Sequence, residues 1–205
     1  MSTGITVRRL SFSYDRDYVF KDFNISSDSN PVLFRGPSGC GKTTLLKLLT
    51  GNLPPIDGAS LPGYRRKLLV LQEDALFPWL SGMSNVKRIL QIEEDAIKRH
   101  PMYNVVQGFI TKPTFSMSFG QRRLVELFRA VLYAPDLLCL DEPFNYLDPE
   151  SRTNASHHLL ALRESGSQLL ISSHYAEDFA IVDAPIFRFS GRLPVSELSI
   201  DAAYE

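Results

Sequence analysis

The chain of 205 residues has only two cysteines, no long apolar run and almost no net charge. Cys40 lies in a glycine-rich segment and Cys139 in an apolar run, so we expect no structural disulfide and a reducing compartment. No segment approaches the ~20 apolar residues that cross a bilayer, and the N-terminal segment lacks the apolar core of a secretion signal. We therefore expect a cytoplasmic protein, either free or peripherally attached to a membrane.

The charge balance also narrows the range of partners. Lysine and arginine number 22 against 23 aspartates and glutamates, and the formal net charge is −1 at pH 7. Proteins that bind nucleic acid regardless of its sequence neutralise phosphates with clustered basic residues. The overall composition therefore gives no reason to expect nucleic acid as a partner, and only local basic patches stay open.

The order of apolar and polar segments predicts an α/β fold. A chain of this length can bury one substantial core, so we expect a single domain over residues 1–205. Short apolar runs typical of strands occur at residues 5–7, 32–34, 67–71, 137–140, 169–172 and 186–189. Helical patterns follow Lys42, fill one or two helices within residues 84–108, and cover residues 120–132 and 149–162. This alternation indicates a mainly parallel sheet covered on both faces.

Two connecting segments have no regular pattern. Residues 26–31 are polar and favour a loop. Residues 52–64 are rich in proline and glycine, so they cannot form one regular element, and we expect them to connect small edge strands.

A phosphate-binding loop follows the apolar run at residues 32–34. Residues 36–43 read GPSGCGKT, in which glycines let successive N–H groups converge on phosphate oxygens at the start of a helix. Lys42 adds a cation and Thr43 a hydroxyl for Mg²⁺, so the segment predicts binding of a nucleoside triphosphate, whereas the simpler alternative is a glycine-rich turn. The candidate nucleotide-binding residues here are Gly36, Ser38, Gly39, Cys40, Gly41, Lys42, Thr43 and Thr44.

Two carboxylates end the apolar run at residues 137–140. Asp141 and Glu142 would lie at the carboxyl end of a strand, where parallel α/β sheets bind ligands. Asp141 would belong to the Mg²⁺ shell, and Glu142 would polarise an attacking water. Taken alone, the pair could equally be a polar turn, but together with the phosphate-binding loop it favours a nucleotide site.

The order of these motifs resembles the nucleotide-binding domain of an ATP-binding cassette (ABC) transporter. The resemblance runs from Tyr14 to beyond His174 and includes Gln72, the segment MSFGQ at residues 117–121, and Asp148. Residues 72–80, QEDALFPWL, resemble those of bacterial importers for small oxyanion or sulfonate-like solutes. The resemblance implies a P-loop NTPase fold with a small antiparallel β-subdomain and a shortened helical subdomain at about residues 81–133.

The same resemblance implies roles for residues outside the phosphate-binding loop. Tyr14 would stack on adenine, although an aromatic that covers the core from an edge strand is the simpler alternative. Gln72 would bind Mg²⁺ and water, and His174 would contact the γ-phosphate, so that Glu142, His174 and Gln72 form the catalytic set and Thr43, Gln72 and Asp141 the metal set. Ser118, Gly120 and Gln121 would contact ATP held by a second cassette.

Two further positions are less straightforward. Asp148 would serve as a helix N-cap before Pro149 and also contact the second cassette. Phe119 stands where the family usually has glycine, and we expect it to weaken the contact with the partner's ATP if that position needs a positive φ or a close approach to phosphate.

The predicted function is an ATP-binding and ATP-hydrolysing subunit that couples dimer closure to solute transport. Its partners would be an identical or different second cassette, integral membrane transporter subunits and a solute-binding protein, with the chain held peripherally on the cytoplasmic face of the membrane. The main alternative is a non-transport ABC ATPase that acts on nucleic acid or a protein assembly. A non-enzymatic nucleotide sensor and a small-molecule kinase are further alternatives.

Overall fold

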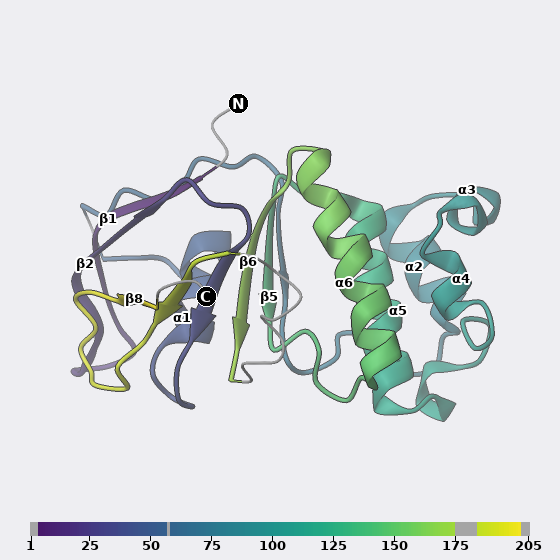
Figure 1. Cartoon of the computed structure of the whole chain (residues 1–205). Helices are drawn as coiled ribbons and strands as arrows, with labels where there is room; N and C mark the ends of the chain where they lie inside the picture. The colour runs from purple at the N-terminus through teal and green to yellow at the C-terminus, as the bar shows by residue number, and fades with distance from the viewer. Residues whose placement is uncertain (1–3, 57, 175–183, 202–205) are drawn as a thin grey trace.

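The computed structural model describes residues 4–56, 58–174 and 184–201, which form two sheets flanked by helices (Figure 1). The strands are β1 (Ile5–Ser13), β2 (Tyr18–Ser27), β3 (Val32–Arg35), β4 (Lys67–Val70), β5 (Leu137–Asp141), β6 (Gln168–Ser173), β7 (Ile186–Arg188) and β8 (Ser199–Asp201). The α-helices are α1 (Lys42–Thr50), α2 (Gly82–Leu90), α3 (Glu94–Arg99), α4 (Tyr103–Val106), α5 (Phe119–Tyr133) and α6 (Pro149–Glu164). Within these ranges no helix is long and apolar enough to cross a membrane.

The larger sheet is mainly parallel, as the sequence predicts. Its six strands have the order β4-β5-β6-β3-β7-β8, and only the β7–β8 pair is antiparallel. The smaller sheet is the antiparallel pair of β1 and β2. Both sheets confirm the α/β fold with a small antiparallel β-subdomain.

The two faces of the larger sheet are buried against different elements. In Figure 1, α1 and the β1–β2 sheet lie on one side, α5 and α6 lie on the other, and α2, α3 and α4 lie outside α5. Because side chains alternate along a strand, Leu137 and Cys139 of β5 pack with α1, whereas Leu138 and Leu140 pack with α5 and α6. The strand is therefore buried on both faces, which explains why its sequence is apolar throughout.

The structure differs from the sequence prediction in several local elements. The predicted one or two helices within residues 84–108 are three short ones, because the chain takes a left-handed conformation at Gln91 and an extended one at His100, just before a proline. β2 was missed because register shifts against β1 break its alternation of apolar and polar residues. Residues 52–64 form no regular strand in the part that the structure describes, only an isolated bridge between Ser60 and Arg8.

Helix α5 begins at a well-defined cap. Ser118 accepts a hydrogen bond from the backbone N–H of Gln121, whose side chain accepts one from the backbone N–H of Ser118. Gly120, in the first turn, lies so close to the loop after β5 that a Cβ atom there would be 2.6 Å from the carbonyl oxygen of Tyr146. A glycine at this position is therefore required by the packing of the helix start against this loop.

A buried amide supports the segment that leads from β4 to α2. The Asn85 side chain on α2 accepts a hydrogen bond from the backbone N–H of Phe77 at 2.7 Å and donates to the carbonyl oxygens of Phe77 and Ser81, both at 3.1 Å. Asn85 is fully buried, so these bonds replace water for both backbone groups of Phe77. The amide thus determines the path of the chain on either side of Phe77.

We expect Asn85→Leu to lower the free energy of unfolding by about 1–3 kcal/mol, because it leaves the backbone N–H of Phe77 without its partner, whereas the Phe77 carbonyl oxygen keeps the donors of Thr114 and Leu80. Urea unfolding followed by circular dichroism measures this change. The control is Asn104→Leu, on the exposed surface of α4, which should change the free energy by less than about 0.5 kcal/mol. Equal effects of the two substitutions would contradict the role assigned to Asn85.

Candidate functional site

Three neighbouring strands end at the same edge of the sheet and bring the predicted motifs together. The order β5-β6-β3 places Asp141 beside Ser172 and Arg35 beside Ser173, so that the phosphate-binding loop, the two carboxylates and His174 follow adjacent strand ends. These segments border a cleft of about 460 Å³. The residues that line it are Tyr14, Val19, Ser38, Gly39, Gly41, Lys42, Thr43, Thr44, Gln72, Asp141, Glu142, His174 and Leu193.

The phosphate-binding loop ends in a helix start that has no side-chain cap. Gly41 has φ 105°, a left-handed conformation that glycine adopts without strain, and it leads directly into α1. The N-cap residue Gly41 has no side chain that could accept a hydrogen bond from the first N–H groups of α1, so these groups can bind an anion. The Lys42 ammonium group donates to the carbonyl oxygens of Gly36 at 2.8 Å and Pro37 at 3.1 Å. Both the helix start and the cation therefore favour a phosphate group.

Cys40 and Gly36, which were also predicted to bind nucleotide, do not line this cleft. The Cys40 side chain is buried in the core beneath the loop, and burial raises the pKa of its thiol. Its sulfur can contribute packing, and only its backbone can face a ligand. Gly36 lies at the rim of a neighbouring cavity with Arg35 and Pro37.

Asp141 connects the ends of two strands, β5 and β6, with the start of α1. The hydroxyl of Thr43, at the start of α1, donates to Oδ2 of Asp141 at 2.5 Å, and the hydroxyl of Ser172 on β6 donates to Oδ1. Mg²⁺ prefers oxygen ligands and is usually held by one or two carboxylates together with substrate phosphates. The adjacent oxygens of Thr43 and Asp141 fit this ion, and the sequence analysis did not identify Ser172.

Glu142 and His174 both line the cleft, and their side chains lie next to each other. Oε1 of Glu142 lies 3.2 Å from Nε2 of His174, and Oε2 accepts the backbone N–H of His174 at 3.3 Å. The hydroxyl of Ser38 lies 3.4 Å from the same Nε2 atom. Glu142 is 3% exposed, and burial raises its pKa, although the neighbouring His174 and Lys42 oppose this shift.

The Oε1 atom of Glu142 is the oxygen best suited to accept a proton. Among the described residues Oε1 of Glu142 is a buried atom without a hydrogen-bond partner of normal geometry. A buried carboxylate oxygen of this kind can accept a hydrogen bond from a water in the cleft.

Tyr14 and Gln72 border the cleft from two sides. Tyr14 follows β1, is 58% exposed, and its hydroxyl lies 3.2 Å from that of Thr44. Its ring packs edge-on against Phe12, which leaves the ring accessible to a ligand. Gln72 follows β4 and also lines a second cavity of about 450 Å³, together with Phe119, Arg123 and Tyr146.

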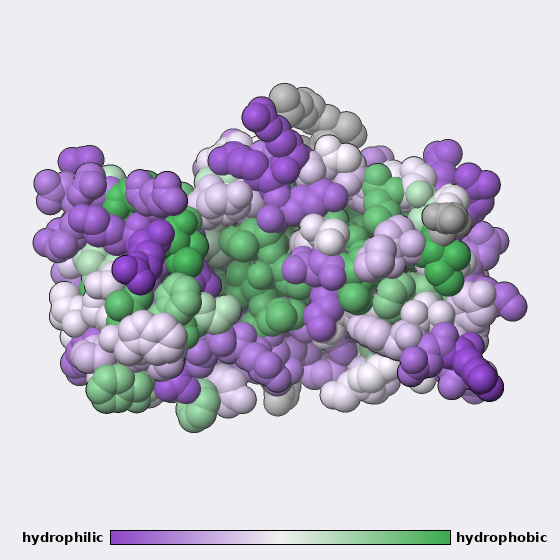
Figure 2. Space-filling model, turned by 180° about the vertical axis from the view of Figure 1, so that it is seen from behind, coloured by the Kyte–Doolittle hydropathy of each residue, from purple (hydrophilic) through white to green (hydrophobic). Residues whose placement is uncertain are grey.

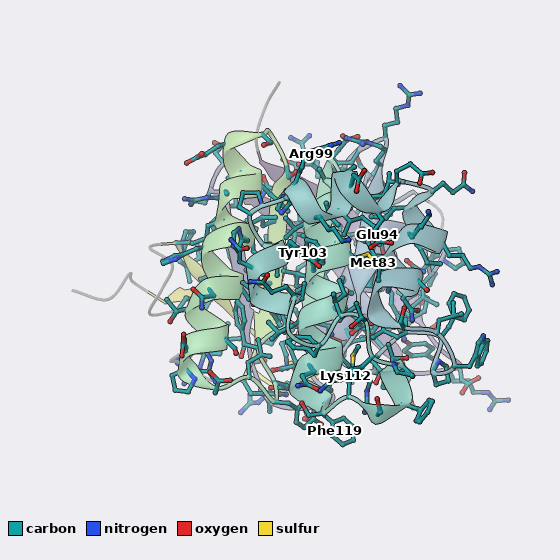
Figure 3. The ribbon with its side chains drawn as sticks, turned by 90° about the vertical axis from the view of Figure 1, so that its right-hand side faces the viewer. Met83, Glu94, Arg99, Tyr103, Lys112 and Phe119 are labelled. Carbon is teal, nitrogen blue, oxygen red and sulfur yellow. The ribbon has the colours of Figure 1, made fainter. Side chains whose placement is uncertain are left out.

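Ser118, Gly120 and Gln121 lie at the start of α5 and do not line the first cleft. Phe119 is the first residue of α5 and has no positive φ, so the bulky side chain causes no backbone strain there. Its ring is 63% exposed and packs against Tyr146, with a centroid separation of 5.3 Å, and against the Arg122 guanidinium, which lies 4.4 Å from the ring centroid. Seen from the end of the molecule where α2, α3 and α4 lie, Phe119 is at the lower edge (Figure 3).

Asp148 is the N-cap of α6, as predicted. Its Oδ1 accepts the backbone N–H of Ser151 at 2.9 Å, and Pro149 occupies the first turn of the helix. The sequence missed Val19 and Leu193 as cleft residues. Val19 belongs to the missed strand β2, and no motif surrounds Leu193, so neither carried a signal.

Comparison with known proteins gives a consistent result. The sequence profile of the ABC transporter family matches residues 22–145. The taurine import ATP-binding protein TauB of Pseudomonas aeruginosa is 34% identical over 93% of this chain and 83% of its own length. The spermidine/putrescine import ATP-binding protein PotA of Spiroplasma citri is 33% identical over 87% of this chain and 57% of its own length.

Solved structures agree on the fold. The structure of an ATP-binding subunit of an ABC transporter superposes with a TM-score of 0.78 and 22% identity, covering 92% of this chain and 87% of that one. The inward-facing structure of a metal-chelate type ABC transporter has the same TM-score at 20% identity, covering 98% of this chain and 83% of that one. The profile match over more than half of the chain, together with the identity to TauB, shows that this chain belongs to the ABC transporter family as an ATP-binding ATPase subunit.

Proposed function

We propose that the cleft binds ATP with Mg²⁺ and hydrolyses it with Glu142 as the base, and that this reaction drives import of a small solute through membrane subunits. The observation that carries the proposal is the position of Glu142. Its buried carboxylate lies beside His174 at the same sheet edge as the phosphate-binding loop, and its Oε1 atom, which makes no hydrogen bond of normal geometry among the described residues, can accept a proton. We further propose that residues 1–205 form one ABC domain with a helical subdomain at about residues 81–133.

The first step is binding of the nucleotide. The N–H groups at the start of α1 and the Lys42 ammonium group bind the outer phosphates, and Tyr14 stacks on the adenine. Thr43, Asp141 and Gln72 hold Mg²⁺, which neutralises charge on the phosphate oxygens when it is bound.

The second step is attack by water on the γ-phosphate. Glu142 accepts a hydrogen bond from the water through Oε1 and orients it, and His174 contacts the γ-phosphate. In reactions of this class the protein contributes positioning and electrostatic stabilisation, and no covalent intermediate on a side chain is required.

A second cassette completes the site. Ser118, Gly120 and Gln121 cannot contact a nucleotide in the cleft of their own chain, because they do not line it. The capping box uses the N–H groups of Ser118 and Gln121, and the remaining N–H groups of the first turn of α5 would face an anion held by another molecule. We propose that they contact ATP bound to a second, identical or different cassette, with Asp148 near the contact.

The membrane partner would bind near the segment between β4 and α2. Trp79 is 68% exposed and Phe115 is 70% exposed, and a backbone hydrogen bond from Phe115 to Pro78 holds their segments together. Figure 2, which views the molecule from behind, shows apolar side chains at the surface of the end that carries the helical subdomain. Exposed aromatic side chains of this kind favour a protein interface. This contact would place the chain on the cytoplasmic face of the membrane.

The matched relatives favour transport over the other functions considered. TauB and PotA are both named as import proteins, whereas a nucleic-acid or ribosome partner has no support in the near-neutral charge of this chain. TauB has a slightly higher identity to this chain than PotA, and the match covers a larger share of TauB than of PotA. This difference favours a small sulfonate such as taurine as the class of solute, delivered by a solute-binding protein.

We expect Glu142→Gln to reduce the ATP turnover number at least about a hundredfold, because an amide cannot accept the proton of the water. The dissociation constant for ATP should change by less than about threefold, since Glu142 is not among the groups proposed to bind the phosphates. Both quantities are measured with Mg²⁺ at a protein concentration that permits dimer formation.

The matched control for this substitution is Glu164→Gln, at the exposed end of α6, which should alter neither quantity. Turnover that stays within threefold of the unsubstituted chain in Glu142→Gln would refute the role of Glu142 as the base.

We expect Phe119→Gly to favour the ATP-dependent dimer, because it removes a bulky exposed ring from the helix start that would approach the partner's phosphate. In the Glu142→Gln background, the ATP concentration for half-maximal dimer formation should fall by at least about threefold, measured by light scattering after gel filtration. Phe115→Gly, which removes a similarly exposed ring from the turn before α5, should leave it unchanged. Weaker dimer formation in Phe119→Gly would show that the ring supports the contact.

A further inference from the structure

Arg123 uses every donor of its guanidinium group within the protein. Its side chain is 4% exposed and lies between α5 and the edge of the sheet that carries the catalytic residues. A guanidinium group has five N–H donors in a planar arrangement. The acceptors are the carbonyl oxygens of Leu71, Asp141, Glu142 and Pro143 and a carboxylate oxygen of Glu126, at 2.6 to 3.2 Å. All five bonds thus go to fixed protein groups.

Four of these five bonds are to the backbone of the two segments that carry catalytic residues. The carbonyl oxygens of residues 141–143 belong to the turn that holds the proposed base, and the bond to Leu71 is made immediately before Gln72. Arg123 itself lies two residues beyond Gln121, in the second turn of α5. One side chain therefore joins the start of α5 to both segments.

Glu126 extends the same connection along α5. Its Oε2 accepts a hydrogen bond from Arg123 at 3.2 Å, and its Oε1 accepts the backbone N–H of Ala75 at 2.6 Å. The segment around Gln72 is thereby held at two points, at Leu71 before it and at Ala75 after it. A change in the orientation of α5 would displace both points together.

The backbone of Glu142 needs this support. Its φ of 50° lies in the left-handed region, which a residue with a side chain adopts only when its surroundings hold it there. Arg123 holds the peptide carbonyls on both sides of the Glu142 Cα atom, and the backbone N–H of Glu142 donates to Ser172 at 3.0 Å. These bonds determine where the side chain of Glu142 points, although Arg123 does not itself line the ATP cleft.

We propose that Arg123 is a positioning residue for ATP hydrolysis. It fixes the positions of the Glu142 backbone and of the strand end before Gln72 relative to the start of α5. The inference rests on the proposed role of Glu142 and extends it to a residue that does not line the ATP cleft. A purely structural buried ion pair would contribute to folding alone and would leave the rate per folded molecule unchanged. The two roles are therefore separable by experiment.

The test compares Arg123→Gln and Arg123→Lys in the full chain with Mg²⁺ and ATP. We expect Arg123→Gln to lower the single-turnover hydrolysis rate by about tenfold to a hundredfold, the range expected for a small displacement of a catalytic group. The dissociation constant for ATP should stay within about threefold, because Arg123 does not line the ATP cleft. Arg123→Lys, which retains the charge and some of the donors, should give an intermediate rate.

Two controls separate positioning from folding. Arg163→Gln removes a partly buried arginine that donates to the carbonyl oxygens of Asn30 and Leu160, away from the cleft, and should leave both quantities within threefold. Arg66→Gln removes an exposed arginine that pairs with Asp136, and should likewise leave both quantities within threefold. Rates are expressed per nucleotide-binding site, so that unfolded protein does not contribute.

A rate per binding site within threefold of the unsubstituted chain in Arg123→Gln, with only a lower melting temperature, would overturn the proposal. If Arg123→Gln does not fold, the same criterion applies to Arg123→Lys. Loss of turnover in Glu142→Gln but not in the Arg123 variants would refute the positioning role alone. Retained turnover in Glu142→Gln would instead refute the proposed base.

Discussion

The arrangement of the site depends on the side-by-side pairing of β5, β6 and β3, whose carboxyl ends meet at one edge of the sheet. The carboxylate of Asp141 accepts hydroxyl hydrogen bonds from Thr43 on α1 and from Ser172 on β6, so one side chain connects the ends of β5 and β6 with the helix that follows β3. A parallel sheet needs a long crossover between neighbouring strands, and those crossovers are the helices that bury its two faces. Binding chemistry and core packing are therefore consequences of the same strand order.

Helix α5 links packing to chemistry. Its apolar face is buried against the sheet, while its first turns carry the capped start at Ser118 and the buried Arg123. Gly120 permits the close approach of the helix start to the loop after β5, and Arg123 then reaches the backbone of that loop. The helix start thus lies against the turn that holds Glu142. Small changes in its orientation would reach the base through these hydrogen bonds rather than through the apolar core.

Much of the fold and of the ATP cleft could be predicted because both depend on local patterns. A buried parallel strand is apolar throughout, and GPSGCGKT requires specific residues at neighbouring positions, so each can be recognised without knowing what lies nearby. Strand β2 was missed because bulges interrupt its alternation, and the segment predicted as one or two helices forms three, α2, α3 and α4, because Gln91 and His100 leave the helical conformation. Such breaks depend on local backbone geometry and on pairing with distant strands, which periodicity does not record.

The sequence by itself determined the class of fold and the chemistry of the phosphate-binding loop, because these follow from residue types at short and regular spacing. Only the tertiary structure decided that Ser172 supports Asp141, that Cys40 is buried in the core, and that Phe119 begins a helix without strain. It also decided that Arg123 binds the backbone beside Glu142, at positions about 20 residues away. Backbone carbonyls occur at every residue and leave no mark in a sequence, so a side chain that binds them is recognisable only once the strands and helices are packed together.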